Sequence, residues 1–167
     1  VAKVNIRILS EAVRQGYTIV ATEPSAVTCI KHDYPLLVDD EETDRVVAAT
    51  TDAMSYLTQL HREGRLRLDF QPLSVSVLYH APCHSRLHGD TSTEQLLRLI
   101  PGLSIQGNDH GCSGMAGTYG LAREHYRSSL RQGRALLTAL RSSAVEAGAT
   151  ECSACRLQME QGNTKPT

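Results

Sequence analysis

The sequence carries almost no net charge. Its 17 lysines and arginines are balanced by 18 aspartates and glutamates, which leaves a formal net charge of −1 at pH 7. A chain that binds nucleic acid or an anionic membrane surface needs an excess of positive charge to attract phosphate groups. The sequence therefore gives no electrostatic case for either surface, and we expect no nucleic acid among the partners.

Long apolar runs and a secretory signal are missing as well. No stretch approaches the ~20 consecutive apolar residues of a transmembrane helix, and no signal precedes the helix expected over residues 3–15. No G-x-G-x-x-G motif is present, so no dinucleotide site is predicted on this chain. We expect a cytoplasmic chain without a direct membrane span; any association with a membrane would be made through partner subunits.

The sequence has five cysteines, an odd number, so they cannot all be paired in disulfides within the chain. In a chain without a secretory signal, the Cys152-Ser153-Ala154-Cys155 segment indicates metal or redox chemistry over a disulfide framework. The length of 167 residues fits one domain with its own core. Val1 stands where an initiator Met is expected, so we predict a single domain over 1–167 that was excised from a larger protein. A natural processed chain is the alternative.

Predicted strands alternate with predicted helices along the chain. Apolar residues recur at helical spacing in the helices, and short β-branched runs mark the strands. This alternation predicts an α/β fold with three layers: a mostly parallel sheet of about four strands, with helices on both faces. The strands are expected at 17–22, 75–79, 103–106 and 144–150, and the helices at 3–15, 25–32, 39–63, 91–100, 117–140 and 153–161.

Each predicted strand is followed by at least one cysteine. Because the carboxyl ends of parallel strands meet at one edge of a sheet, we expect these thiols to converge there. A cysteine pair two residues apart at a helix start suits the capture of one metal ion or cluster, and the helix N-terminus favours the thiolate. The predicted ligands are Cys83, Cys112, Cys152 and Cys155, with Cys29 as a further candidate; a buried small side chain is the alternative reading of Cys29.

Glycines and histidines surround two of these cysteines. Gly111, Gly114 and Gly117 let the backbone approach an inorganic centre and point N–H groups at it, although a plain strand-to-helix turn explains them too. His84 and His110 lie beside Cys83 and Cys112, where an imidazole ligates, donates to sulfur or carries protons. A lone histidine is more often structural. Glu151 ends the last predicted strand beside the site, where a carboxylate accepts protons or hydrogen-bonds a ligand; a surface carboxylate at a helix start is the more ordinary reading.

Three segments resemble the cysteine-rich CCG domain. They are 79–88 (YHAPCHSRLH), 111–120 (GCSGMAGTYG) and 150–162 (TECSACRLQMEQG). That domain occurs in one of the subunits of heterodisulfide reductase, in the iron–sulfur subunits of anaerobic glycerol-3-phosphate dehydrogenase and glycolate oxidase, and in the C-terminal module of FAD-linked oxidases. The resemblance implies a noncubane iron–sulfur cluster, or zinc in some members. Because such proteins usually carry two motifs, it also implies that this chain is the C-terminal fragment of a larger oxidoreductase.

One position departs from the family pattern of a cysteine, then Cys-Cys-Gly, then Cys-x-x-Cys. Here the pair before Gly114 is Cys112-Ser113, and a hydroxyl is a poorer ligand for iron or zinc than a thiolate. A cubane [4Fe–4S] cluster, a zinc ion, a cluster completed by Ser113 or Cys29, and an empty site all stay open.

Three functions are compatible with this pattern. The resemblance implies a non-catalytic electron-transfer domain that relays electrons from a flavin-containing dehydrogenase domain or subunit to an acceptor, with FAD bound elsewhere. A structural zinc-binding or metal-free domain is the alternative, since four thiolates satisfy tetrahedral zinc. A dithiol enzyme that uses Cys152 and Cys155 is the third, and it leaves Cys83 and Cys112 without a role.

Overall fold

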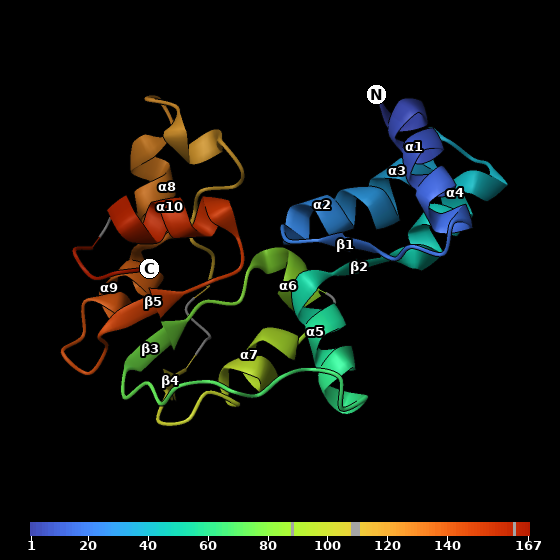
Figure 1. The fold of residues 1–167 in the computed structure, drawn as a ribbon. Coiled ribbons are helices and arrows are strands. Elements are labelled where there is room, and N and C mark those ends of the chain that lie inside the picture. Colours follow the sequence, from blue (N-terminus) through green and yellow to red (C-terminus); the bar gives the residue numbers. More distant parts are fainter. Residues whose placement is uncertain (88, 108–110, 162) are drawn as a thin grey trace. The chain divides into compact units, whose positions relative to one another are not determined.

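The computed structural model describes residues 1–87, 89–107, 111–161 and 163–167 (Figure 1). The chain divides into two compact units, Val1–Leu66 and Arg67–Thr167. Each unit holds its own small sheet of parallel strands and its own helices. Whether the two units together form the single domain expected over 1–167 stays a prediction.

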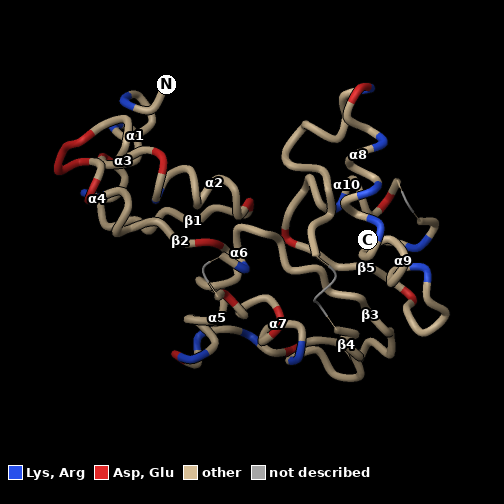
Figure 2. The backbone as a smooth tube through the Cα atoms, turned by 180° about the vertical axis from the view of Figure 1, so that it is seen from behind, with Lys and Arg blue, Asp and Glu red and all other residues tan. Residues whose placement is uncertain are grey.

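The first unit is built around the parallel pair of β1 (Ile19–Ala21) and β2 (Thr50–Asp52). A buried cluster of Ile6, Val38 and Val46 joins α1 to α4 and to the segment before α4. Acidic residues gather in the first turn of α4, beside the positive end of its helix dipole (Figure 2). The helices are α1 (Ala2–Arg14), α2 (Pro24–Thr28), the π-helix η1 (Cys29–Asp33), α3 (Tyr34–Leu37), α4 (Glu41–Ala49) and α5 (Ala53–Arg62).

The continuous helix expected over 39–63 is wrong, because β2 interrupts it. Two carboxylates set the helix starts on either side of the break. The Asp40 side chain accepts a hydrogen bond from the backbone N–H of Thr43 at 2.8 Å, and that of Asp52 accepts one from the N–H of Ser55 at 2.7 Å. Such caps satisfy backbone donors that a helix start leaves free. The capping signal of Asp52 therefore outweighs the helical spacing of the apolar residues around it.

The second unit contains three parallel strands in the order β4-β3-β5. The α/β architecture and the parallel pairing are thereby confirmed, although the five described strands form two sheets instead of one sheet of about four. The elements are β3 (Ser76–Tyr79), α6 (Cys83–Leu87), α7 (Ser92–Leu97), β4 (Ser104–Gln106), the 3₁₀ helix η2 (Tyr119–Leu121), α8 (Tyr126–Gln132), α9 (Arg134–Leu140), β5 (Ala147–Ala149) and α10 (Ser153–Gln161).

The helix expected over 117–140 is also divided, into η2, α8 and α9. Ala116 and Gly117 have φ of 47° and 65°, a left-handed conformation that no right-handed helix passes through. Among the described helices, none is long and apolar enough to cross a membrane.

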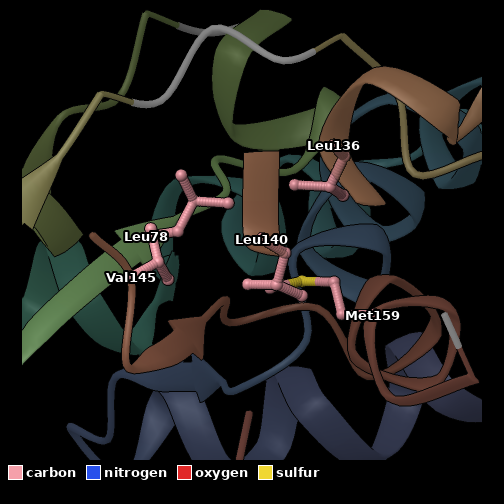
Figure 3. Packing of buried hydrophobic residues seen from close by; sticks show 5 residues of the cluster. All are labelled: Leu78, Leu136, Leu140, Val145 and Met159. Carbon is pink, nitrogen blue, oxygen red and sulfur yellow. The ribbon is translucent and has the colours of Figure 1, made fainter. Parts of the chain in front are cut away.

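The core of this unit lies between β3, α9 and α10 (Figure 3). Figure 3 shows the side chains of Leu78, Leu136, Leu140, Val145 and Met159 directed toward one another. Leu136, Leu140 and Met159 have no exposed surface. Burial of this apolar surface holds α9 and α10 against the sheet, and α10 carries Cys155 with it.

Leu140→Ala is expected to lower the free energy of unfolding by about 2–5 kcal/mol, because it leaves a cavity in a fully buried cluster. Urea denaturation followed by circular dichroism measures the change. Leu157→Ala is the matched control, since Leu157 on α10 is 45% exposed and its truncation is expected to cost under about 0.5 kcal/mol. Equal losses in both variants would contradict this description of the core.

Candidate metal centre

Each strand of the second unit leads into a cysteine-bearing segment. β3 is followed by Cys83, the first residue of α6, and β5 is followed by Cys152 and by Cys155 in the first turn of α10. Cys112 lies in the loop that follows β4. Because the three strands are parallel neighbours, their carboxyl ends lie at one edge of the sheet.

Cys83 lies close enough to Cys112 to affect the ionisation of the Cys112 thiol. Burial is the main cause that raises the pKa of the Cys112 thiol, and the neighbouring Cys83 raises it further. Two features oppose the rise: the backbone N–H of Gly114 donates to the Cys112 sulfur at 3.2 Å, and the Arg86 guanidinium adds a positive charge. The half-buried Cys112 is thus held beside the exposed Cys83.

Cys155 forms the second pair with Cys152, and both are buried. A hydrogen bond with Cys152 is the largest cause that raises the pKa of Cys155, and burial adds to it. The negative charge of an ionised Cys83 raises the pKa further, which links the two pairs. The raised pKa favours the protonated thiol of Cys155 in the metal-free chain, so metal binding there must displace a proton.

The four thiols approach as two pairs rather than as a finished ligand set. Within the part of the chain that the structure describes, no group of three or more His, Cys, Asp or Glu side chains is arranged so that it could hold a metal ion. The donor chemistry nevertheless fits a thiolate-bound metal, because N–H or O–H groups already point at three of the sulfurs. They are Arg86 toward Cys83, Gly114 toward Cys112 and Ser113 toward Cys155. Such groups orient ligands and stabilise thiolates.

Ser113 serves as a hydrogen-bond donor here. Its hydroxyl donates to the Cys155 sulfur at 3.2 Å, and its side chain is only 2% exposed. This bond lowers the pKa of Cys155 against the larger effects of Cys152 and burial. Ser113 therefore joins the loop after β4 to the helix after β5.

The remaining candidates have different surroundings. Cys29 begins η1 in the first unit, where burial and then Asp33 raise the pKa of its thiol. His84 is half-buried on α6, and His110 lies outside the described residues. Gly111 and Gly117 have positive φ angles and open space where a Cβ would stand. The ligand roles of these residues stay predictions.

Gly114, unlike Gly111 and Gly117, is packed closely against the backbone of another segment. A Cβ on Gly114 would lie 2.1 Å from the carbonyl oxygen of Ser129, and one on Gly133 would lie 2.2 Å from the carbonyl oxygen of Ser113. The loop that carries Cys112 is thus seated on the junction between α8 and α9, with no room for a side chain on either surface. Gly133 was not singled out in the sequence, because it lies inside the range 117–140, where one continuous helix was expected.

Glu151 is not the surface carboxylate that its position suggested. It is partly buried, and its Oε1 accepts hydrogen bonds from the Tyr79 hydroxyl at 3.0 Å and the Ser85 hydroxyl at 3.1 Å. These bonds tie the end of β3 and helix α6 to the residue before Cys152. Burial is the main cause that raises the pKa of Glu151, and the two hydroxyls oppose it.

Gly133→Ala is expected to destabilise the protein by about 1–3 kcal/mol, because the new methyl group overlaps the Ser113 carbonyl. Hydrogen exchange should then show faster opening of the loop that carries Cys112. Gly107→Ala is the control, since a Cβ there meets no atom within 4 Å and its φ lies outside the left-handed region. Equal protection of the loop in both variants would refute the backbone packing described above.

Glu151→Gln is expected to keep both hydroxyl bonds through its amide oxygen while removing a buried charge. Because the folded-state pKa of Glu151 lies above the ordinary value of 4.5, its protonated form favours the fold. The native chain should therefore lose stability relative to Glu151→Gln as pH rises through that raised pKa. Urea midpoints between pH about 4 and 8 measure this difference. Glu160→Gln, which changes an exposed carboxylate on α10, is the control; the same trend in it would count against the buried network.

Comparisons with known proteins confirm the resemblance to the cysteine-rich CCG domain. The family described as "CCG: Cysteine-rich domain" matches residues 77–160. A subunit of the anaerobic glycerol-3-phosphate dehydrogenase of Escherichia coli K12 is 34% identical over 165 residues, which is 96% of this chain and 40% of that protein. The same subunit from Escherichia coli O157:H7 gives the same values. This chain thus spans 40% of the length of these relatives. No solved structure matches. The chain belongs to the cysteine-rich CCG domain family.

Proposed function

We propose that this chain is the iron–sulfur-binding, electron-transfer part of a larger flavin-linked dehydrogenase or oxidase. Cys83, Cys112, Cys152 and Cys155 would hold the centre, which when bound supplies one-electron chemistry. The flavin would lie on another domain or subunit, and the chain would pass its electrons to an acceptor. The parent protein would be cytoplasmic, with any membrane association made through partner subunits.

One observation carries this proposal: the cysteine segments follow three parallel strands, and donors already point at three of the sulfurs. Hydrogen bonds to sulfur and burial are the means by which a protein tunes an iron–sulfur centre. The similarity to one component of a multi-subunit dehydrogenase supports a redox setting and a partner subunit. This chain's residues would exclude water at Cys152 and Cys155, which are buried, and leave Cys83 exposed toward the solvent.

A structural zinc site is the second candidate. Its support is Ser113, which stands where the family pattern has a further cysteine and donates a hydrogen bond to Cys155. Four thiols therefore remain as candidate ligands in the second unit. Four thiolates complete tetrahedral zinc without a fifth ligand. In that case the centre would close the edge of the sheet and carry no electrons.

Anaerobic reconstitution with iron and sulfide tests the proposal. The native chain is expected to turn brown and retain iron and sulfide, whereas Cys152→Ser should lose most of both because it removes a buried ligand. Cys29→Ser is the matched comparison in the first unit. If this variant retains its iron, Cys29 is not a ligand; if it loses iron, Cys29 is a ligand in addition to the other four cysteines. A colourless protein with one zinc per chain would favour the structural site. A protein that takes up neither metal would overturn both.

A further inference from the structure

Arg86 connects the segment of Cys83 to the segment of Cys112. It lies on α6, three residues after Cys83. Its Nη2 group lies 3.4 Å from the Cys83 sulfur and donates to the carbonyl oxygen of Gly111 at 2.9 Å. Gly111 directly precedes Cys112. One terminal nitrogen, which carries two hydrogens, thus bonds the segment after β3 to the segment after β4.

The same guanidinium also acts through its charge. Its Nη2 group lies 3.4 Å from the Cys83 sulfur and 2.9 Å from the carbonyl oxygen of Gly111, the residue before Cys112. A guanidinium keeps its charge at every pH at which proteins fold, so this field does not depend on a titration. A permanent cation therefore lies at the Cys83 sulfur and beside the residue that precedes Cys112.

The surroundings of Arg86 show that its removal need not disturb the core. The side chain is exposed and borders a cavity of about 340 Å³, together with Tyr79, Thr91 and Glu94. The buried cluster of Leu78, Leu136, Leu140, Val145 and Met159 does not include it. Substitution of Arg86 is therefore expected to leave a folded protein.

We propose that Arg86 is a positioning residue of the metal centre, which clamps the Cys83 helix to the Cys112 loop and sets a fixed positive charge beside their sulfurs. This inference rests on the proposed function, because it concerns the same four thiols. The clamp pre-organises two ligands before metal arrives. The charge favours the state of the centre with one more electron, and so raises its reduction potential.

Cobalt(II) binding to the full chain under anaerobic conditions tests the clamp, because its sulfur-to-metal absorption reports thiolate ligation. Arg86→Gln is expected to weaken cobalt binding about tenfold, as loss of a group that orients a ligand commonly does. Arg86→Lys should recover part of the affinity, since it restores the charge without the planar fork. Arg98→Gln is the control: this exposed arginine pairs with Glu94 and has no bond to a cysteine segment among the described residues. Native affinity in Arg86→Gln would overturn the clamp.

The reduction potential of the reconstituted iron–sulfur protein tests the charge. Among molecules that retain the centre, Arg86→Gln should show a more negative potential than the native chain, while Arg86→Lys should stay near the native value. A purely structural role would lower the iron content without moving the potential of the fraction that still holds iron. An unchanged potential in Arg86→Gln would overturn the electrostatic part.

A metal-free measurement separates this inference from the proposed function. Dibromobimane, a short reagent that joins two thiols, should link Cys83 to Cys112 several-fold faster in the native chain than in Arg86→Gln, as located by peptide mass spectrometry. If the native chain binds neither cobalt nor iron, the proposed function fails, and the linking rates alone decide the clamp. Equal linking rates in the two proteins would overturn it whether or not metal binds.

Discussion

Parallel pairing of β4, β3 and β5 is the constraint on which the candidate centre depends. Parallel strands cannot be joined by tight turns, so the chain must leave each carboxyl end and return through a helix or a long loop. Each departure at this edge carries a cysteine, and residues that are far apart in sequence become neighbours. The short strands supply only a few backbone hydrogen bonds, so side chains of the connecting segments hold the edge together: Glu151 toward Tyr79 and Ser85, and Ser113 toward Cys155.

Burial and ionisation oppose each other at this edge. Cys152 and Cys155 are buried where a thiolate without a metal is unfavourable, and Cys155 ionises less readily than a free thiol. A bound metal ion reverses that preference, because it neutralises the thiolates and displaces their protons. The hydrogen-bond donors at Cys83, Cys112 and Cys155 stabilise the thiolate form and so oppose the effect of burial. The free energy of metal binding would thus add to the free energy of folding.

The sequence predicted the arrangement of the second unit well, because its signals are local. Apolar runs located β3, β4 and β5 to within a few residues, and the helix after Cys152 ends where it was expected, at Gln161. Helix continuity was predicted poorly. Asp52 caps a second helix inside the range 39–63, and the left-handed Ala116 and Gly117 prevent one long helix over 117–140.

The supporting residues of the site could not be found in the same way, because their partners are distant in the chain. Arg86 bonds to Gly111, 25 residues away, and Glu151 accepts from Tyr79, 72 residues away. Ordinary surface arginines and carboxylates have the same local pattern, and Gly133 lies inside a range where one continuous helix was expected. The two-residue spacing of Cys152 and Cys155 was enough to predict them as candidate metal ligands. The groups that orient the thiols could not be predicted in this way, because they depend on the register of the sheet and on the packing of α8 and α9.

The graded exposure of the cysteines gives the edge a direction. Cys83 is exposed, Cys112 is half-buried, and Cys152 and Cys155 are buried. A metal ion bound here would meet Cys83 and Cys112 before Cys152 and Cys155 as it arrives from solvent, and would have to release Cys152 and Cys155 first as it leaves. Metal exchange at such a site would proceed by stepwise ligand exchange. The exposed Cys83 and half-buried Cys112 would control entry, and the buried Cys152 and Cys155 would set the residence time of the ion.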